Sequence, residues 1–244
     1  PLLTVHNAGE CIINPRIEFK DSKSKYSEPW KVSNYTRENA DEISKNKYGF
    51  PNYGGSINDA SLLRYLDELK RRNLKIMFYP MFFLDVDKKP WRGRVSGSPN
   101  EVKSFFTKQG GYNEFILHYA NLVKGKVDAF VIGSELIGLT RVKDHKNNFP
   151  AVLELISLAA KVKNILGNQV QITYAADWSE YHHTDAGWYN LDPLWASENI
   201  DFIGIDNYMP VTDSLTSKIT DEEIIYGIKR GEGYDYYVDR EQNE

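Results

Sequence analysis

The sequence contains one cysteine, Cys11, among its 244 residues. A single cysteine cannot form a disulfide within the chain, and it cannot build a cysteine-rich metal cluster. No stretch approaches the roughly 18 apolar residues that a membrane-spanning helix needs. The sequence therefore predicts neither a disulfide framework nor insertion into a membrane.

Several motifs that usually mark cofactor sites and nucleophilic serines are also missing. No GxGxxG or GxxxxGK segment occurs, and no GxSxG segment occurs either. Their absence argues against a nucleotide cofactor and against acyl-enzyme chemistry. His6 has no second histidine two residues on, and the adjacent His182 and His183 do not have the i, i+4 spacing of two ligands on one helix face. We therefore expect no metal site and no cofactor.

Charge and composition limit the kinds of binding partner to expect. The formal net charge is −4, and lysine and arginine are scattered along the chain, which argues against nucleic acid as a partner. A hydrophobic fraction of 41% and a charged fraction of 26% are ordinary for one globular domain. Aromatic residues reach 13%, and many fall in expected loops, where rings can stack on sugars. The start at Pro1 and the polar end DREQNE lead us to expect a piece of a longer protein.

The chain is organised around the segment VDAFVIGSELIGLT, Val127 to Thr140. Its apolar run, broken only by Asp128, has the length of one strand and the composition of a strand buried on both faces, as in a parallel sheet. Gly133 and Ser134 give a tight exit from the strand, and Glu135 follows. In a βα barrel the C-terminal strand ends carry the chemistry, so Glu135 is a candidate general acid.

Strand and helix patterns alternate on both sides of this segment. The firm strands are expected at 74–79, 127–132, 170–176 and 200–208, and helices at 60–72, 101–108, 112–124, 150–166, 192–198 and 222–230. The crossovers are long enough for right-handed βαβ units. We expect one domain over residues 1–244 with a parallel sheet, and periodicity alone leaves open whether that sheet closes into a barrel.

Polar and aromatic residues follow each of the four firm strands. They are Tyr79 and Asp85, then Glu135, then Asp177 with Trp178, then Asp206, Asn207 and Tyr208. The long loop after the first of these strands adds Trp91 and Arg92 as a candidate ligand wall. If the sheet closes, these strand ends meet on one rim. Carboxylates with Trp and Tyr are what glycan hydrolysis uses, because one acid protonates the leaving oxygen while a second carboxylate attacks or activates water.

Simpler explanations exist for the same residues. Glu135 could cap the next segment or pair with Arg141. Trp91 and Arg92 could be ordinary surface packing, and the whole set of strand-end residues could serve scaffold hydrogen bonding.

Taken together, the longer segments resemble a known family. YGGSINDASLLRYLDELKRRNLKIMFYPMFFLD, PWRGR, VDAFVIGSELIGLT, ITYAADWSEYHH, IDFIGIDNYMPVTD and GEGYDYY are similar to the TIM-barrel-like domain of gene-transfer-agent and phage-tail proteins. That family is usually described as glycoside-hydrolase-like. The resemblance runs from about Trp30 to Asp239.

The resemblance implies a (β/α)8 TIM barrel related to retaining glycosidases, in which the general acid/base is a glutamate at the end of the fourth strand. The segment GSE places that role at Glu135. The nucleophile implied by the family is a second glutamate at the end of the seventh strand, which we expect beyond Glu244. About six strands are expected in this chain, so the barrel would be incomplete.

Two functions follow as alternatives. The first is a glycoside hydrolase acting on a bacterial envelope glycan, with Glu135 as acid/base and the rim residues Tyr79, Asp85, Trp91, Arg92, Asp177, Trp178, Asp206, Asn207 and Tyr208 binding the sugar. The second is a catalytically inactive structural or carbohydrate-binding module. In both, the resemblance implies other tail proteins as partners, in the tail of a phage-like particle made in the bacterial cytoplasm.

Overall fold

A computed structural model of the chain describes residues 6–20, 29–86, 88–184, 187–212, 214 and 218–230. The segment GEGYDYY, used in the resemblance, lies outside these residues. The helices are α1 (Asp59–Arg71), the 3-10 helix η1 (Arg92–Arg94), α2 (Pro99–Thr107), α3 (Tyr112–Leu122), α4 (Ile137–Thr140), α5 (Pro150–Leu166), α6 (Asp192–Trp195) and α7 (Asp221–Arg230).

The strands are mostly short. They are β1 (His6–Asn7), β2 (Arg16–Ile17), β3 (Lys31–Val32), β4 (Tyr35–Thr36), β5 (Asp41–Glu42), β6 (Met77–Phe78), β7 (Val95–Ser96), β8 (Ala129–Ser134), β9 (Gln171–Asp177), β10 (His183–Thr184), β11 (Gly187–Trp188) and β12 (Gly204–Asp206). Four of them form the main sheet, in the order β12-β9-β8-β6, and all three of its pairs are parallel.

Strand β8 is the centre of the molecule, as the sequence predicts. All six of its residues are buried, because β6 and β9 flank it and helices cover it. The register with β9 shifts between Val131 and Ser134, so the strand bulges just before its end. Glu135 follows at φ 51°, in the left-handed region that a residue other than glycine seldom occupies. The bulge and this turn together set the direction of the glutamate.

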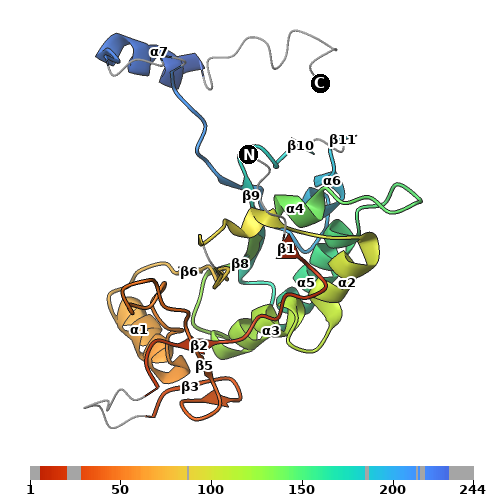
Figure 1. Cartoon of the computed structure of the whole chain (residues 1–244). Coiled ribbons are helices and arrows are strands. Elements are labelled where there is room, and N and C mark those ends of the chain that lie inside the picture. The colour runs from red at the N-terminus through yellow and green to blue at the C-terminus, as the bar shows by residue number, and fades with distance from the viewer. Residues whose placement is uncertain are drawn as a thin grey trace.

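Helices α2, α3 and α5 pack on one another beside β8 (Figure 1). Helix α5 begins with Pro150 at its first turn and ends before Gly167, as the sequence predicts. Its Leu155, Leu158 and Val162 are fully buried in the core that the helix forms with the sheet. Alternating residues of β8 and β9, Phe130, Ile132, Ile172 and Tyr174 among them, complete this core, so the opposite face of the same strands is left to form the site.

The expected strand over 74–79 is only partly correct. Only Met77 and Phe78 pair with β8, and Leu74 and Met77 are exposed rather than buried on both faces. Pro80, which has no backbone N–H to donate, follows directly. The parallel sheet of the expected fold is present, with four strands among the described residues, whereas its closure into a complete or incomplete barrel remains a prediction.

The remaining strands pair outside this sheet. Strands β2 and β5 form a parallel pair, β1 and β7 another, β3 and β4 a short hairpin, and β10 and β11 an antiparallel pair. In Figure 1, β2, β3 and β5 lie near α1, while α7 stands apart from the other helices at the end of a long connection. Among the described residues, no helix is both long and apolar enough to cross a membrane.

Candidate functional site

Glu135 lies at the C-terminal end of β8 with its side chain nearly buried. The indole Nε1–H of Trp91 donates to Glu135 Oε2 at 2.5 Å, and Arg92 Nη2 lies 2.8 Å from the same oxygen. The Glu135 and Arg92 side chains are 6% and 12% exposed, so this ion pair is largely shielded from water. The other carboxylate oxygen, Oε1, makes no hydrogen bond within the described part of the chain.

Arg92 joins the ends of two strands of the main sheet. Its Nε donates to the carbonyl oxygen of Ser134 at 2.9 Å, and its Nη2 donates to Ser134 Oγ at 2.5 Å. The same Nη2 lies 4.0 Å from Asp206 Oδ2, at the end of β12. Two carboxylates, Glu135 and Asp206, therefore face one guanidinium group and lie close to each other.

Asp206 is held by two hydroxyl groups. Tyr79 Oη and Ser134 Oγ each donate to Asp206 Oδ2 at 2.7 Å. Burial raises the pKa of Tyr79 well above its usual value, and the charge of Asp206 raises it further, so Tyr79 stays a hydroxyl donor. These bonds run from β6 across β8 to β12, which is possible because parallel strands end at the same edge of a sheet.

The structure thus brings five of the ten predicted residues into one hydrogen-bonded cluster, which we call the rim cluster. It consists of Tyr79, Trp91, Arg92, Glu135 and Asp206, together with Ser134, which the sequence analysis did not assign to the site. Glu135 pairs with Arg92 rather than Arg141. Trp91 and Arg92 both contact the Glu135 carboxylate, and their role as a ligand wall stays a prediction.

The other predicted residues lie outside the rim cluster. Asp177 is buried at the end of β9, where its Oδ1 accepts hydrogen bonds from the backbone and hydroxyl of Ser179, and Trp178 follows it half-buried. Asn207 caps the turn to Met209 with its side-chain oxygen, and Tyr208 is 71% exposed. These four residues lie at or just beyond the ends of β9 and β12, but none of their described hydrogen bonds or ion pairs is with Glu135.

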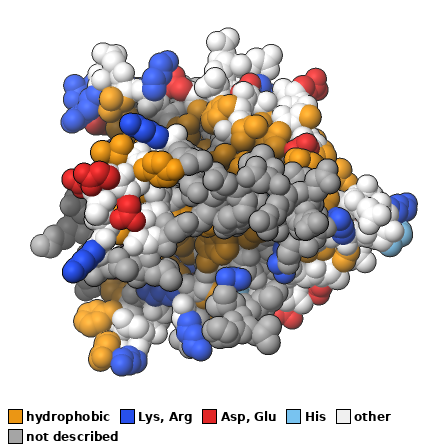
Figure 2. All heavy atoms as spheres, turned by 90° about the horizontal axis from the view of Figure 1, so that it is seen from above, with side chains coloured by type: hydrophobic (Ala, Val, Ile, Leu, Met, Phe, Trp, Pro, Cys, Tyr) orange, Lys and Arg blue, Asp and Glu red, His pale blue; other side chains and the backbone are white. Residues whose placement is uncertain are grey.

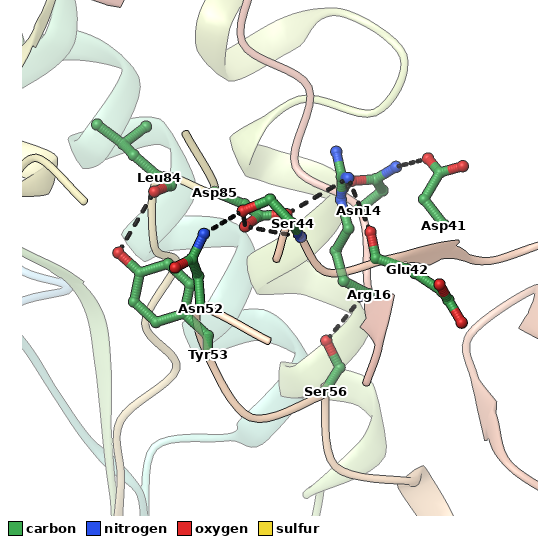
Figure 3. Close-up of polar contacts among 10 residues, drawn as sticks. All are labelled: Asn14, Arg16, Asp41, Glu42, Ser44, Asn52, Tyr53, Ser56, Leu84 and Asp85. Carbon is green, nitrogen blue, oxygen red and sulfur yellow. Dashed lines mark hydrogen bonds and ion pairs between the residues drawn. The ribbon is translucent and has the colours of Figure 1, made fainter. Parts of the chain in front are cut away.

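Asp85 belongs to a second polar cluster (Figure 3). Its carboxylate accepts from the Ser44 hydroxyl at 2.6 Å and from the Ser44 backbone, and it lies 3.5 Å from Arg16 Nη1. Tyr53 and Asn52 extend this cluster, through Leu84 and Ser44 respectively. Asp85 therefore ties the loop after β6 to the segment after β5, and the structure does not place it in the contact network of Glu135.

A cleft of about 630 Å³ is lined by residues of both clusters, although Glu135, Arg92 and Asp206 are not among its lining residues. Tyr79 of the rim cluster and Asp85 of the second cluster both line it. Its walls are rich in rings, with Tyr53, Phe78, Phe82, Phe83, Phe115 and Tyr119, and carry polar groups such as Asn14 and Arg16. An aromatic cleft with a few charged and amide groups is a common form of ligand site.

Besides Ser134, the sequence analysis did not identify Glu180. It is fully buried and accepts from Thr140 Oγ1 at 2.5 Å, Tyr174 Oη at 2.9 Å and the Asp177 backbone N–H at 3.0 Å. Burial raises the pKa of this carboxyl to about 7, against the opposing effect of its three hydrogen-bond donors, and the nearby Asp177 charge raises it further. The segment DWSE places Glu180 three residues beyond the strand end, a spacing that suggested only a loop.

The surface agrees with the mixed charge of the sequence. Figure 2 shows one face, where charged side chains of both signs lie around the margin and apolar side chains lie nearer the middle. Within the described ranges, no three His, Cys, Asp or Glu side chains come together as metal ligands would.

Comparisons with known proteins found a family-model match over the C-terminal half of the chain. The family model of the GTA TIM-barrel-like domain matches residues 110–244, a range that includes Glu135 and Asp206 but begins after Tyr79, Trp91 and Arg92. No curated protein matches the sequence. Among solved structures, a chitinase (RmChi1) from Rhizomucor miehei aligns at a TM-score of 0.34 and 13% identity, over 62% of this chain and 44% of the chitinase.

Proposed function

Because the chain belongs to the GTA TIM-barrel-like domain family, we propose that it is a glycoside hydrolase that acts on a bacterial envelope glycan, with Glu135 as the general acid/base. The observation that supports this best is the state of the Glu135 carboxylate. Oε2 is fixed by Trp91 and Arg92, while Oε1 has no hydrogen bond among the described residues. A carboxyl group held by one oxygen presents the other to a ligand in a fixed direction.

The reaction we propose is proton transfer from Glu135 to the glycosidic oxygen as the bond to the anomeric carbon breaks. A second carboxylate attacks that carbon, and Glu135 then takes a proton from the water that releases the sugar. The family resemblance implies a second glutamate in this role. Asp206, held by Tyr79 and Ser134, would bind a sugar hydroxyl with its Oδ1.

The aromatic cleft supplies the binding surface in this proposal. Sugar rings carry apolar C–H faces that pack on aromatic side chains, and their hydroxyls need polar partners. Tyr53, Tyr79 and Phe83 offer the first kind of contact, and Arg16 and Asn14 the second. The exposed Tyr208 and its neighbour Asn207 extend the same rim, and Asp177 with Trp178 would support it. The tail of a phage-like or gene-transfer-agent particle, with other tail proteins as partners, is the setting in which such an activity opens an envelope.

One observation favours a second candidate, a tail module that binds glycan without cleaving it. Arg92 and Trp91 cover Glu135 and leave its side chain 6% exposed. A carboxylate tied up in a shielded ion pair is also what a purely structural network would contain. The two candidates differ in whether Glu135 reaches a substrate.

The test is an assay of the full-length protein on purified bacterial cell-wall glycan, beside Glu135→Gln. We expect the wild type to release reducing ends and the substitution to reduce the rate by at least about 100-fold, since the acid/base is lost. Glu68→Gln makes the same chemical change on the exposed face of α1 and serves as the control. Glycan binding without release by either protein, with folding intact by circular dichroism, would support the binding module instead.

A further inference from the structure

Glu180 connects three segments around the turn that carries Glu135. Its Oε1 accepts from Thr140 in α4 and from Tyr174 in β9, and its Oε2 accepts from the backbone N–H of Asp177 at the end of β9. The described partners of Glu180 include no lysine, arginine or histidine. A buried carboxylate without a cation depends on its donors, so these three bonds hold it in one orientation.

Tyr174 links Glu180 to the backbone next to Glu135. Its hydroxyl oxygen accepts from the backbone N–H of Leu136 at 2.7 Å while its hydrogen points to Glu180. Leu136 directly follows Glu135, whose backbone is in the left-handed region at φ 51°. On the other side, the backbone N–H of Glu135 donates to the Ala175 carbonyl at 2.9 Å. The strained turn is therefore held by hydrogen bonds from two consecutive N–H groups, those of Glu135 and Leu136. The bond from Leu136 depends on Tyr174 and, through it, on Glu180.

We propose that Glu180 is a positioning residue for Glu135, acting through the Tyr174 hydroxyl and the Leu136 backbone. The proposal rests on the proposed function, because it assigns Glu180 a part in the same site. The hydrogen bond to Glu180 fixes the orientation of the Tyr174 hydroxyl, so that a lone pair of its oxygen points to the Leu136 N–H. Without the carboxylate, the Tyr174 hydroxyl can rotate, and the turn loses the bond that fixes the Glu135 side chain against Trp91.

The Trp91 indole provides a readout that does not depend on activity. Its Nε1–H donates to Glu135 Oε2, so its ¹H–¹⁵N resonance reports the position of that carboxylate. The chain has five tryptophans, and Trp91→Phe identifies the resonance by its loss. The variants are Glu180→Gln, Tyr174→Phe and their combination, in the full-length protein.

We expect either single substitution to move the Trp91 resonance, and the combination to move it no farther than the larger single effect, because the two residues act in series. In the activity assay, kcat should fall about tenfold to a hundredfold while KM changes by less than about twofold, since positioning is lost but the cleft is intact. Thr140→Val is the matched control, because it removes a donor to Glu180 but leaves the Tyr174 bond in place. It should lower stability while the Trp91 resonance and kcat stay near wild type.

The outcomes separate the two proposals. A Trp91 resonance that is unchanged in both single variants, or effects on kcat that multiply in the combination, would overturn the positioning role. If the wild type releases no reducing ends from any glycan yet the resonance moves in both variants, the proposed hydrolase is wrong and the link from Glu180 to Glu135 stands. Tyr174→Phe keeps the ring that fills the core, so it tests the link even if Glu180→Gln does not fold.

Discussion

Arg92 is the cation of the rim cluster, and its partners define what it does. It serves the Ser134 carbonyl and hydroxyl and the Glu135 carboxylate at once, and it faces Asp206 as well. A guanidinium group suits this task, because its planar donors reach several acceptors in fixed directions. A lysine at the same position would offer one point charge in place of this fork.

Removal of Arg92 should therefore be costly. We expect Arg92→Ala to lower the free energy of unfolding by about 3 kcal/mol, since it leaves the Glu135 charge shielded from water and without its cation. Arg71→Ala, which breaks the exposed pair with Glu68 on α1, is the control and should cost far less, because solvent screens that pair. Urea unfolding followed by circular dichroism measures both. Equal losses for the two variants would show that the rim pair is no more than a surface contact.

The sequence predicted which residues belong to the rim cluster better than it predicted the hydrogen bonds among them. Strand ends and residue types were enough to select Tyr79, Glu135 and Asp206, because parallel strands end at one edge. The hydrogen bonds among them depend on the bulge before Ser134 and on the path of the loop at Trp91 and Arg92. Neither leaves a periodic pattern. Glu180 was missed for the same reason, because a glutamate in a loop is normally solvated.

At the scale of elements, prediction succeeded where burial is continuous. Strand β8 and helix α5 were recognised because every face of the strand and one whole stripe of the helix are apolar. Strand β6 was overestimated, since the apolar run from Leu74 to Phe83 continues into a loop that lines the cleft. A hydrophobic run predicts burial or ligand contact, and the sequence does not distinguish the two.

The short helix α4 positions the loop that carries Trp91 and Arg92. It packs against the turn at η1 and β7, and Gly138 makes this approach possible: a Cβ atom there would lie 2.3 Å from the Val95 carbonyl oxygen and 2.5 Å from that of Gly93. Backbone oxygens at those distances have to move. Since η1 begins with Arg92, the position of α4 sets where Trp91 and Arg92 meet Glu135.

Gly138→Ala tests this dependence. We expect it to lower the free energy of unfolding by about 1–3 kcal/mol, as an overpacked site does, and to shift the Trp91 indole resonance as the loop moves. Gly54→Ala is the control, because a Cβ atom there meets nothing within 4 Å. If Gly138→Ala leaves both the stability and the Trp91 resonance at their wild-type values, the loop is positioned by something other than α4.

For the whole molecule, the stability at different pH values is set by groups whose pKa differs between the folded and unfolded chain. Two glutamates act in opposite directions. Hydrogen bonds from the Ser98 hydroxyl and backbone and from Asn7 lower the pKa of Glu101 to about 2, so its contribution is present above the ordinary value of 4.5 and is lost as the pH falls toward 2. Burial raises the pKa of Glu180 to about 7. The two groups therefore act in separate pH ranges.

Between pH 4.5 and 7, Glu180 should dominate the pH dependence. The folded chain binds the Glu180 proton more tightly than the unfolded chain does, so the contribution of Glu180 to the free energy of unfolding falls as the pH rises through this range, by on the order of 3 kcal/mol in total, and levels off above it. Burial lowers the pKa of His182 and His183, so these two groups contribute a slope of the opposite sign in both proteins. Urea unfolding at a series of pH values measures the slope. Glu180→Gln cannot ionise, so its slope in this range should be much flatter than that of the wild type, while both proteins lose stability alike below pH 4.5. Parallel curves from pH 4.5 to 7 would show that Glu180 is charged in the folded chain throughout, in which case its three donors alone outweigh the cost of burial.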